Sequence, residues 1–536
     1  MAMRDRSTSD QIRKGSVRWP VVAGFICAIA GIAAATDRTE NEKSLNLVPW
    51  PKTVELTGGS MKLSATSRIC IADKALAPLA KVLAGEIHQI TGLDLQSAED
   101  DVKAGDIALE YAVDLKGSSS AKRTGPTPLL GANEAYRLKV TDRAVVSGGE
   151  YQGVAWGTVT LLQAITAKNG VSSIPRLNIA DKPFAPYRGA MLDLARRMNM
   201  IQEIRQCVVL CRLYKIRYLH LHLSDDHAWV FPSTMFPKLG ESNTGYEGMA
   251  PYVFKLGELK DLVKFADARG VTLIPEVDVP GHTDRLRIDY PLVFDTGEPN
   301  KPACMGILNM SFDKAQDGMN TLTGEMIDVF NSSPFFHFGA DEPRVDMAAG
   351  RNSYAPYMKK MGLADPYELY LHFITLMDSY VKKHGRSSLI WADFNGNSTP
   401  RTKVPTDVTC LCWQNDSNAA ESLTKQGYPV INATWNPLYA VNAKATCSEI
   451  TDPARGGIGP MEAIFKWNMY TFDKLVIPPT NKVLGAQVCS WESGGEVQVP
   501  LLRWRLPALS ERTWSPDAGK TFADFTSRFD AVNPMV

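Results

Sequence analysis

The sequence predicts an α/β protein in which a small α/β domain precedes a (β/α)8 TIM barrel. Two patterns after Arg188 support the barrel: short apolar runs recur along the chain, and helix-like stretches lie between them. A third pattern is that polar residues gather directly after the apolar runs. Buried parallel strands have this near-continuous apolar character, and the carboxyl ends of all strands in a barrel open on one face. We therefore expect a single site at that face.

Eight apolar runs are predicted to be the barrel strands. They are Gly189–Leu194, Ile216–Leu223, Val271–Val277, Pro334–Gly339, Ser387–Ala392, Val408–Trp413, Tyr428–Ala433 and Val483–Ser490. Helical periodicity between the runs is clear in Leu256–Arg269 and Tyr367–Lys383. After the proline-marked boundary Lys182–Pro186, the barrel domain is predicted to span residues 184–536.

Residues 46–181 are predicted to form the small N-terminal α/β domain. Apolar residues at helical spacing fill residues 73–92, which start with an aspartate cap and end with glycine. Residues 106–112 and 135–146 have the alternation of strands, and residues 150–166 are predicted to be a helix. No cluster of catalytic residue types occurs here, so we interpret this domain as a scaffold.

The first 35 residues have the form of a secretory signal peptide. Basic residues precede the apolar run Pro20–Ala34, and three alanines end it as a small-residue cleavage site. The run is short for a membrane span, which needs about 20 apolar residues; an uncleaved N-terminal anchor is the alternative. Residues 36–45 are predicted to be a polar tether. We expect export to the periplasm or the extracellular space, with no stable membrane span after processing.

The composition limits the partners and cofactors. Lys+Arg and Asp+Glu both number 58, so the net charge is zero, which argues against a nucleic-acid partner. Of nine cysteines, Cys27 lies in the predicted signal peptide and the others are thinly spread. Their spacing contains no CxxC pair and no metal-site signature, so we expect no metal and no cofactor. The spacing assigns no disulfide, and nothing in the sequence specifies an oligomeric state.

Carboxylates, histidines, arginine and tryptophans follow the predicted barrel strands. They are Asp193, Arg196, His220, His222, Asp225, Asp226, Glu276, Asp278, His282, His337, Asp341, Glu342, Trp391, Asp393, Trp413, Trp435, Trp491 and Glu492. In a barrel all of these positions lie at the mouth where active sites occur. Paired carboxylates with nearby histidines and tryptophan faces suit the hydrolysis of glycosidic bonds.

The adjacent pair Asp341 and Glu342 indicates one version of this chemistry. Two neighbouring carboxyls in a partly buried site have separated pKa values, so that one is an anion while the other holds a proton. The usual glycosidase scheme needs two carboxyls about 5–9 Å apart. Adjacent residues suit that scheme poorly because successive side chains point different ways. They do suit substrate assistance, in which the 2-acetamido carbonyl of the sugar is the nucleophile.

Five motifs in order resemble family 20 of the glycoside hydrolases, the β-N-acetylhexosaminidases. They are RGAMLDLARR from Arg188, HLHLSDDHAW from His220, PEVDVPGH from Pro275, HFGADE from His337 and RLPALSERTW from Arg505. LVPWPKTVEL and YQGVAWGTVTLLQ in the small domain extend the likeness over nearly all of the mature chain. The resemblance implies a retaining exo-β-N-acetylhexosaminidase that acts on glycans with a terminal β-linked GlcNAc or GalNAc.

The resemblance also implies the catalytic roles. Glu342 is expected to be the general acid and then the base for water. Asp341 is expected to hold the acetamido N–H as an anion, and Tyr439 to donate to the acetamido oxygen. Asp225 and His282 are expected to form a relay that tunes Glu342.

Sugar-binding roles follow from the same resemblance. Arg188 is expected to contact the hydroxyls of the sugar through its forked guanidinium. Trp391, Trp413 and Trp491 are expected to wall the sugar and its acetamido group. Separately from the resemblance, the histidines at the strand ends, His222, His282 and His337, are expected to form a polar ring around the site, and His222 is taken as a substrate contact.

The chain departs from the family where the C4 and C6 hydroxyls of the sugar would be held. The family usually has a glutamate two residues after the last-strand tryptophan; here that position is Ser493, with Glu492 one step early and Glu496 further on. The family usually has an aspartate or asparagine two residues after the pocket tyrosine; here that position is Val441, with Asn442 beside it. We take Glu492 as a candidate substrate contact. We hypothesise an altered preference among GlcNAc, GalNAc and 6-modified sugars, or release of disaccharides.

Two alternatives belong to other functional classes. One is a metal-dependent barrel hydrolase, whose candidate ligands are His220, His222, His282, His337 and Asp341. The other is a sugar-binding relative without catalysis. The second alternative is disfavoured because the acid, its neighbour and the pocket tyrosine are all retained.

Overall fold

The computed structural model describes residues 42–115, 134–246, 249–295, 306–345, 353–394, 402–414, 418–441, 458–517 and 521–535. The predicted signal peptide, residues 36–41 of the predicted tether, and Asn442 lie outside these residues. Within the described part of the chain, no helix is both long and apolar enough to cross a membrane.

The N-terminal domain is built on an eight-stranded sheet. Its strands are β1 (Thr53–Leu63), β2 (Arg68–Ile71), β3 (Gln96–Ala98), β4 (Ile107–Tyr111), β5 (Tyr136–Val140), β6 (Ala144–Gly148), β7 (Thr166–Lys168) and β8 (Val171–Asp181). The order is β1-β8-β5-β6-β4-β2-β3, with β7 paired to β8. Residues 135–146, whose alternation predicts strand, form two strands, because Thr141 N donates to Arg143 O at 2.9 Å and turns the chain into the β5–β6 hairpin.

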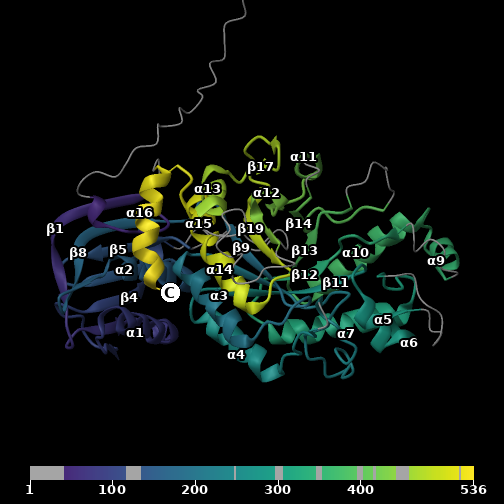
Figure 1. Ribbon diagram of the computed structural model, residues 1–536, viewed down its shortest axis with the longest axis horizontal. Helices are drawn as coiled ribbons and strands as arrows, with labels where there is room; N and C mark the ends of the chain where they lie inside the picture. Colours follow the sequence, from purple (N-terminus) through teal and green to yellow (C-terminus); the bar gives the residue numbers. More distant parts are fainter. Residues whose placement is uncertain are drawn as a thin grey trace, which may run out of the picture. The chain divides into compact units, whose positions relative to one another are not determined.

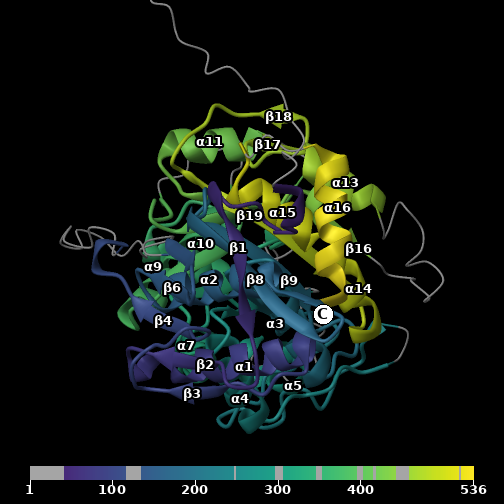
Figure 2. The same ribbon diagram turned by 90° about the vertical axis from the view of Figure 1, so that its left-hand side faces the viewer.

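Two helices pack against this sheet and against each other (Figures 1 and 2). Helix α1 (Ala77–Thr91) ends at Gly92, whose φ of +73° suits a glycine at the end of a helix. Helix α2 (Tyr151–Ala164) is buried on nearly every side. The reason is that barrel helix α3 (Ile201–Leu213) lies beside it, and Gln163 Nε2 donates to Leu213 O at 2.9 Å.

Eight parallel strands close into a barrel, as the sequence predicts (Figure 1). They are β9 (Tyr187–Asp193), β10 (Tyr218–His222), β11 (Thr272–Val279), β12 (Phe335–Gly339), β13 (Ser387–Trp391), β14 (Thr409–Cys412), β15 (Val430–Asn432) and β19 (Val483–Trp491). The order is β15-β14-β13-β12-β11-β10-β9-β19, and pairing of β15 with β19 closes the ring. Every residue on these strands is buried, because helices cover the outside and side chains fill the inside.

The barrel strands alternate with helices that cover them. Besides α3 these are α4 (Leu256–Asp267), α5 (Asp284–Asp289), α6 (Pro291–Phe294), α7 (Asp313–Val329), α9 (Tyr354–Met361), α10 (Pro366–Lys383), α11 (Asn418–Gln426), α12 (Trp435–Leu438), α13 (Ile458–Lys466), α14 (Gly495–Arg503), α15 (Leu506–Trp514) and α16 (Phe522–Val532). The chain also forms the small hairpin of β17 (Thr471–Phe472) and β18 (Leu475–Val476). A short strand that was not predicted, β16 (Tyr439–Val441), pairs in parallel with the end of β19. It brings Tyr439 to the barrel mouth.

The barrel interior changes from aromatic to polar along the strands. Near the amino ends, Tyr187 stacks on Tyr218 with ring centroids 4.8 Å apart, and Phe335 packs edge-on against Tyr218 at 5.5 Å. Near the carboxyl ends, histidine, carboxylate and tryptophan side chains replace these rings. The polar groups are therefore concentrated at one mouth, above an apolar plug.

The C-terminal helix α16 joins the barrel domain to the start of the N-terminal domain. Arg528 Nη1 donates to Leu47 O at 2.6 Å, and Arg528 Nη2 donates to Glu511 Oε1 at 2.8 Å. Helices α13 and α16 lie side by side in Figure 2. The ring centroids of Phe465 on α13 and Phe525 on α16 are 4.9 Å apart.

Candidate active site

The adjacent carboxylates lie on the segment that follows β12. Gly339, Ala340 and Glu342 have φ values of +67°, +74° and +41°. For residues other than glycine, such a conformation costs on the order of 1–3 kcal/mol. The segment is held by neighbours: Tyr370 OH donates to Ala340 O at 2.5 Å, and Glu342 N donates to Asp393 Oδ2 at 2.8 Å. These contacts fix the directions of both carboxyls.

The two carboxyls differ in exposure and in pKa. Only 12% of the Asp341 side chain is exposed, whereas 53% of the Glu342 side chain is exposed. Burial raises the pKa of Asp341, and a hydrogen bond with His282 lowers the pKa of Glu342. The two pKa shifts run in opposite directions, and each opposes the role expected of its residue. In the free site burial disfavours the Asp341 anion, and the contact with His282 favours the Glu342 anion.

A histidine relay reaches Glu342 through His282. Its Nε2 lies 3.3 Å from Glu342 Oε2, and its Nδ1 lies 3.1 Å from Asp226 Oδ2. Burial opposes a charge on His282, but Asp226 and Glu342 raise its pKa well above the usual value. The relay partner is thus Asp226, and the prediction for Asp225 is wrong. Successive side chains point to different sides of the chain, so only one of two adjacent aspartates faces the histidine.

Asp225 instead anchors an arginine at the mouth. Its Oδ2 lies 2.6 Å from Arg196 Nη2 and 3.1 Å from His222 Nε2. Arg196 Nη1 also lies 3.1 Å from Asp193 Oδ2, and its guanidinium lies 5.0 Å from the centre of the Trp491 ring. The Arg196 side chain keeps 14% of its surface exposed. It is therefore a fixed cation beside the tryptophan that ends β19.

Arg188 lies at the opposite end of β9 and takes no part in this site. It is fully buried, pairs with Glu134, and donates to Lys215 O at 3.0 Å and Ala185 O at 2.8 Å. Its guanidinium lies 4.9 Å from the centre of the Trp514 ring. The prediction that Arg188 contacts the sugar is wrong, because the amino ends of barrel strands face away from the mouth.

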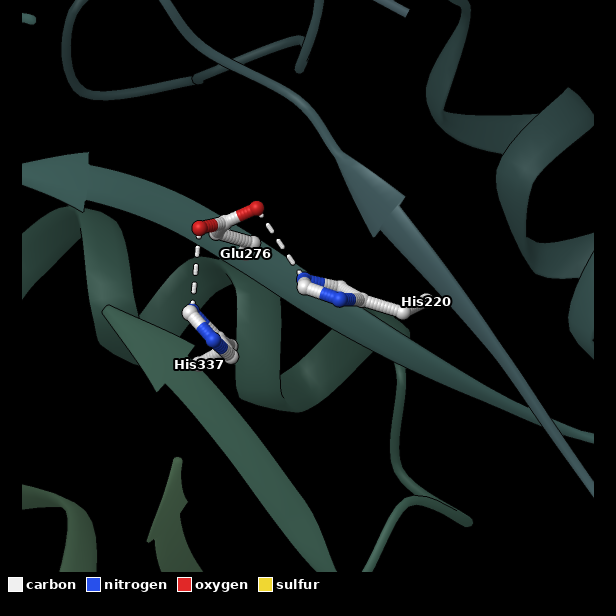
Figure 3. Close-up of side chains that lie close together, drawn as sticks. All are labelled: His220, Glu276 and His337. Carbon is white, nitrogen blue, oxygen red and sulfur yellow. Dashed lines mark ion pairs between the residues drawn. The ribbon is translucent and has the colours of Figure 1, made fainter. Parts of the chain in front are cut away.

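A buried hub centred on Glu276 lies among the strand ends. Glu276 Oε2 lies 3.0 Å from His220 Nε2 and 2.6 Å from His222 Nδ1. Its Oε1 lies 3.0 Å from His337 Nδ1 and accepts from Trp391 Nε1 at 2.8 Å. Figure 3 shows the carboxylate between His220 and His337. Burial alone would raise the pKa of Glu276, but the histidines lower it well below the usual range.

His222 serves this hub rather than the substrate. It is fully buried, and its two ring nitrogens face Glu276 and Asp225. Burial opposes its charge, yet these two acids raise the pKa of His222 well above the usual value. The prediction that His222 contacts the substrate is wrong, since both nitrogens are already engaged.

The contacts of the hub also test whether a metal ion fits. Among the described residues, three overlapping sets have ligand atoms within 4.8 Å of one another: His220–Glu276–His337, His222–Glu276–Asp278 and Asp225–Asp278–His282. Each oxygen of Glu276 already has one hydrogen bond, Oε2 with His222 Nδ1 at 2.6 Å and Oε1 from Trp391 Nε1 at 2.8 Å. Those nitrogens occupy the directions that a metal would need. The donor set therefore suits a hydrogen-bonded cluster better than a metal-dependent site.

Asp278 is a further carboxyl of the site to which the sequence assigned no role. A Cβ at position 339 would lie 1.8 Å from Asp278 Oδ1, so Gly339 is what permits this approach. Burial and the neighbouring Asp341 raise the pKa of Asp278 well above the usual range. Asp278 therefore keeps its proton more firmly than an ordinary aspartic acid, which limits the negative charge below Asp341.

Asp393 forms hydrogen bonds with both Glu342 and Trp413. Its Oδ2 accepts from Glu342 N at 2.8 Å, and its Oδ1 accepts from Trp413 Nε1 at 2.7 Å. Burial and the charge of Asp341 raise the pKa of Asp393 to about 7. One side chain thus fixes the backbone of Glu342 relative to the ring of Trp413.

The predicted aromatic residues come together at the mouth. Trp391 and Trp491 are 1% and 9% exposed, and their rings lie 5.7 Å apart. Tyr439 stacks on Trp413 with centroids 6.4 Å apart and an interplanar angle of 17°, and lies 6.3 Å from Trp491. Burial raises the pKa of Tyr439 well above the usual range, so its hydroxyl remains a hydrogen-bond donor.

Glu492, rather than Glu496, faces the site. Glu492 N donates to Asp193 Oδ2 at 3.0 Å, and Asp193 also holds Arg196. Glu492 Oε1 accepts from Tyr246 OH at 3.2 Å. Glu496 lies exposed on the first turn of α14. Tyr246 comes from a loop after β10 and carries no motif signal in the sequence.

Sequence reasoning assigned no role to several residues of this site. They are Arg196, Asp226, Asp278, Glu276, Asp393 and Tyr246. All except the tyrosine stand at or just after strand ends, so their position marked them as candidates. The direction of each side chain was the missing information.

Together, these groups can move a proton at an exposed oxygen while an adjacent carboxyl faces a developing positive charge. Cleavage of a glycosidic bond requires both actions, and tryptophan faces suit the sugar ring. The fold and the site thus define a glycoside hydrolase.

Two family models identify the family to which the chain belongs. The model described as Glycosyl hydrolase family 20, catalytic domain, matches residues 185–517, and the model described as Glycosyl hydrolase family 20, domain 2, matches residues 44–182. The chain therefore belongs to glycosyl hydrolase family 20.

Similar proteins are distant in sequence. A beta-hexosaminidase of Porphyromonas gingivalis is 26% identical over 94% of this chain, which spans 66% of that relative. A beta-N-acetylhexosaminidase of Cellulomonas fimi is 24% identical over 90% of this chain and 92% of its own length. The crystal structure of a GH20 exo beta-N-acetylglucosaminidase from Vibrio harveyi has a TM-score of 0.75 at 21% identity, covering 96% of this chain and 80% of that one. This last likeness establishes the fold.

Proposed function

We propose that the protein is a retaining exo-β-N-acetylhexosaminidase, which removes a terminal β-linked GlcNAc or GalNAc with the 2-acetamido group as nucleophile. The observation that carries the proposal is the unequal pair after β12. Glu342 is exposed at the mouth and contacts His282, while Asp341 is buried beside it. The hexosaminidase names of the relatives support the same activity.

In the first step, the acetamido carbonyl oxygen attacks C1 while the glycosidic C1–O bond breaks. Glu342 gives its proton to the departing oxygen, which leaves as an alcohol. The cyclic intermediate is positively charged. The Asp341 anion accepts a hydrogen bond from the N–H of this intermediate. Tyr439 donates to the acetamido oxygen and aligns it with C1. Asp341 and Tyr439 are thus the groups that make the substrate its own nucleophile.

In the second step, water attacks C1 and Glu342 takes its proton. The bond between C1 and the acetamido oxygen breaks, and the acetamide is restored. Two inversions at C1 give net retention. Glu342 ends the cycle protonated, ready for the next substrate.

Substrate binding has to oppose both pKa shifts of the free site. A sugar above Glu342 removes water from a side chain that is 53% exposed, and this raises the pKa of that carboxyl. An acetamido N–H that donates to Asp341 stabilises its anion and lowers its pKa. His282, whose pKa is well above the usual value, keeps its charge and holds the Glu342 carboxyl in place, with Nε2 3.3 Å from Oε2.

Arg196 and Glu492 suit the hydroxyls on the far side of the sugar from Glu342. They place a donor fork and an acceptor near each other, both held by Asp193. A negatively charged 6-substituent would meet the Glu492 carboxylate. We therefore expect a preference for sugars without a negatively charged 6-substituent.

A substrate panel tests the mechanism. Aryl β-GlcNAc, β-GalNAc, 6-sulfated β-GlcNAc and plain β-glucoside are compared in the wild type, Glu342→Gln and Asp341→Asn. We expect turnover of the acetamido sugars alone, with kcat lower by about 10²–10⁴-fold in both variants. Equal cleavage of the plain glucoside would show that the acetamido group is not the nucleophile. Equal rates on 6-sulfated β-GlcNAc and on unmodified β-GlcNAc would contradict the proposed charge preference.

The alternatives give different outcomes in the same assay. A metal-dependent hydrolase would lose activity in a chelator and carry stoichiometric metal. A sugar-binding relative without catalysis would show no turnover that depends on Glu342.

We also propose that the protein is exported after removal of residues 1–35. The mass of the mature protein outside the cytoplasm tests this. A mature chain that keeps its first residues would instead indicate an N-terminal anchor.

A further inference from the structure

We infer that Tyr246 is a positioning residue that sets the sugar preference of the site, because it fixes the direction of the Glu492 carboxylate. The preference concerns C4 of the released sugar, where GlcNAc has an equatorial hydroxyl and GalNAc an axial one. The inference rests on the proposed hexosaminidase function and adds to it a residue for the choice between these two sugars.

The Glu492 carboxylate is anchored by Tyr246. Tyr246 OH donates to Glu492 Oε1 at 3.2 Å. In the part of the chain that the structure describes, no other side chain forms a hydrogen bond or an ion pair with this carboxylate. The backbone of Glu492 is fixed separately, because its N donates to Asp193 Oδ2 at 3.0 Å. The direction of the carboxylate therefore depends on one phenol, and Glu492 Oε2 stays open to accept from a ligand.

Tyr246 is itself held by the segments that follow β9 and β10. Tyr246 N donates to Arg196 O at 2.8 Å, and its ring lies 4.4 Å from the ring of His227. The preceding Gly245 has a φ of +61°, and a Cβ there would lie 1.9 Å from Met249 O, so the turn before the tyrosine requires glycine. The loop thus presents the phenol at a fixed position before a sugar binds.

The phenol keeps its proton near neutral pH. Burial and the Glu492 carboxylate raise the pKa of Tyr246 to about 12, although Arg196 opposes this rise. Tyr246 therefore donates its hydrogen bond to a charged acceptor. Such a bond is stronger than one between neutral groups, so it can hold a side chain that would otherwise rotate.

The position of Glu492 indicates which part of the sugar this contact affects. C4 lies across the pyranose ring from C1, so residues on the far side of the sugar from Glu342 meet the hydroxyls at C4 and C6. Arg196 and Glu492 are these residues in the proposed complex. The C4 hydroxyl points in different directions in GlcNAc and GalNAc, and a carboxylate held in one direction accepts well from one of them. A carboxylate that rotates freely would serve both sugars.

Two aryl substrates and a matched set of variants isolate this role. The substrates are p-nitrophenyl β-GlcNAc and p-nitrophenyl β-GalNAc, which differ only at C4. They are measured with the wild type, Tyr246→Phe, Glu492→Ala and the double variant. The control is Tyr252→Phe, since Tyr252 OH donates to Glu258 Oε2 at 2.9 Å at the start of α4 and the change removes the same kind of hydrogen bond.

We expect Tyr246→Phe to lower kcat/KM for the preferred sugar about fivefold to tenfold, mainly through KM. The ratio of kcat/KM between the two sugars should move toward one by a similar factor, because the less favoured sugar loses little. In the Glu492→Ala background, Tyr246→Phe should change neither substrate by more than about twofold, since its partner is already absent. Tyr252→Phe should leave both the rates and their ratio unchanged.

Four outcomes would overturn the inference. They are equal rates on both sugars in the wild type; an unchanged ratio in Tyr246→Phe; a loss in Tyr246→Phe that persists in the Glu492→Ala background; and the same loss in Tyr252→Phe. A wild type that hydrolyses neither substrate would instead overturn the proposed function itself.

Discussion

The two ends of the barrel hold similar charged residues in opposite electrostatic states. At the amino end, burial alone would raise the pKa of Glu134, but Arg188 and Arg217 lower it. At the carboxyl end, burial and neighbouring acids raise the pKa values of Asp278 and Asp341. The amino end is neutralised for stability, whereas the carboxyl end pairs Glu276 with histidines but leaves Asp278 and Asp341 with raised pKa values. A site that stabilises a positive intermediate needs such an imbalance, at a cost in stability.

The opposite pKa shifts at the two ends predict opposite responses of protein stability to pH. A carboxyl with a lowered pKa contributes stability above its unfolded-state pKa, and this contribution is lost as pH falls through the folded-state value. A carboxyl with a raised pKa binds its proton more tightly in the folded state, so stability falls as pH rises between the two values. We therefore expect variants at the amino end to change mainly stability, and variants at the carboxyl end to change mainly activity.

The largest expected effect is on stability, at the amino end. Arg188→Met leaves Glu134 as a buried charge without its closest partner, and should lower the free energy of unfolding by about 3–5 kcal/mol. Activity per folded molecule should stay near that of the wild type. Chemical denaturation and active-site titration measure the two quantities. A specific loss of kcat/KM in the folded fraction would contradict the structural role of Arg188.

The matching change at the carboxyl end should affect activity instead. Arg196→Lys keeps the charge between Asp193 and Asp225 but loses the guanidinium fork. We expect kcat/KM to fall by about 10–100-fold while the free energy of unfolding changes by less than about 1 kcal/mol. Steady-state kinetics and denaturation provide both values. An unchanged kcat/KM would remove Arg196 from the substrate site.

The next largest effect is expected on the pH profile of activity, when the relay from Asp226 through His282 to Glu342 is changed. Asp226→Asn removes a group that raises the pKa of His282, so His282 charges less and the lowered pKa of Glu342 moves up. We expect kcat to fall about tenfold, and the limb of kcat/KM that belongs to Glu342 to move to higher pH.

Asp225→Asn is the matched comparison for this prediction. It should weaken substrate binding by loosening Arg196, without moving that limb. If Asp225→Asn moved the limb and Asp226→Asn did not, the relay would be assigned to the wrong aspartate.

The smallest expected effect concerns Asp393, whose pKa is raised to about 7. Because this carboxyl lowers stability as pH rises from about 4 to about 7, Asp393→Asn removes that dependence. Relative to the wild type, the variant should gain about 1–2 kcal/mol across this range, less than the full shift because Asp393 is only partly buried. Urea denaturation at several pH values measures the trend. A constant difference between the two proteins would show that Asp393 is not the group that titrates.

Much of the fold followed from local patterns. The eight barrel strands were predictable because strands covered on both faces are apolar throughout. The hairpin of β5 and β6 was not, because its turn lacks glycine or proline and the alternation of apolar residues runs across it. Strand β16 was too short to give any periodic signal.

The candidate site shows the same division. Position after a strand end identified nearly every residue at the mouth, and the motif of Asp341 and Glu342 identified the carboxylate pair. Arg188 stands at the start of β9 and Arg196 just after its end, and two aspartates adjoin each other after β10. In both cases the sequence-based choice was wrong. Each choice depended on a side-chain direction that no local pattern records.

The sequence by itself determined a barrel, its mouth, and which residue types stand there. Only the tertiary structure decided that Arg196 and Asp226, not Arg188 and Asp225, take part in the site. It also decided the directions in which the pKa values of Asp341 and Glu342 shift. The physical reason is that burial and charge pairing arise between strands far apart in the chain, as where Asp193 meets the backbone of Glu492.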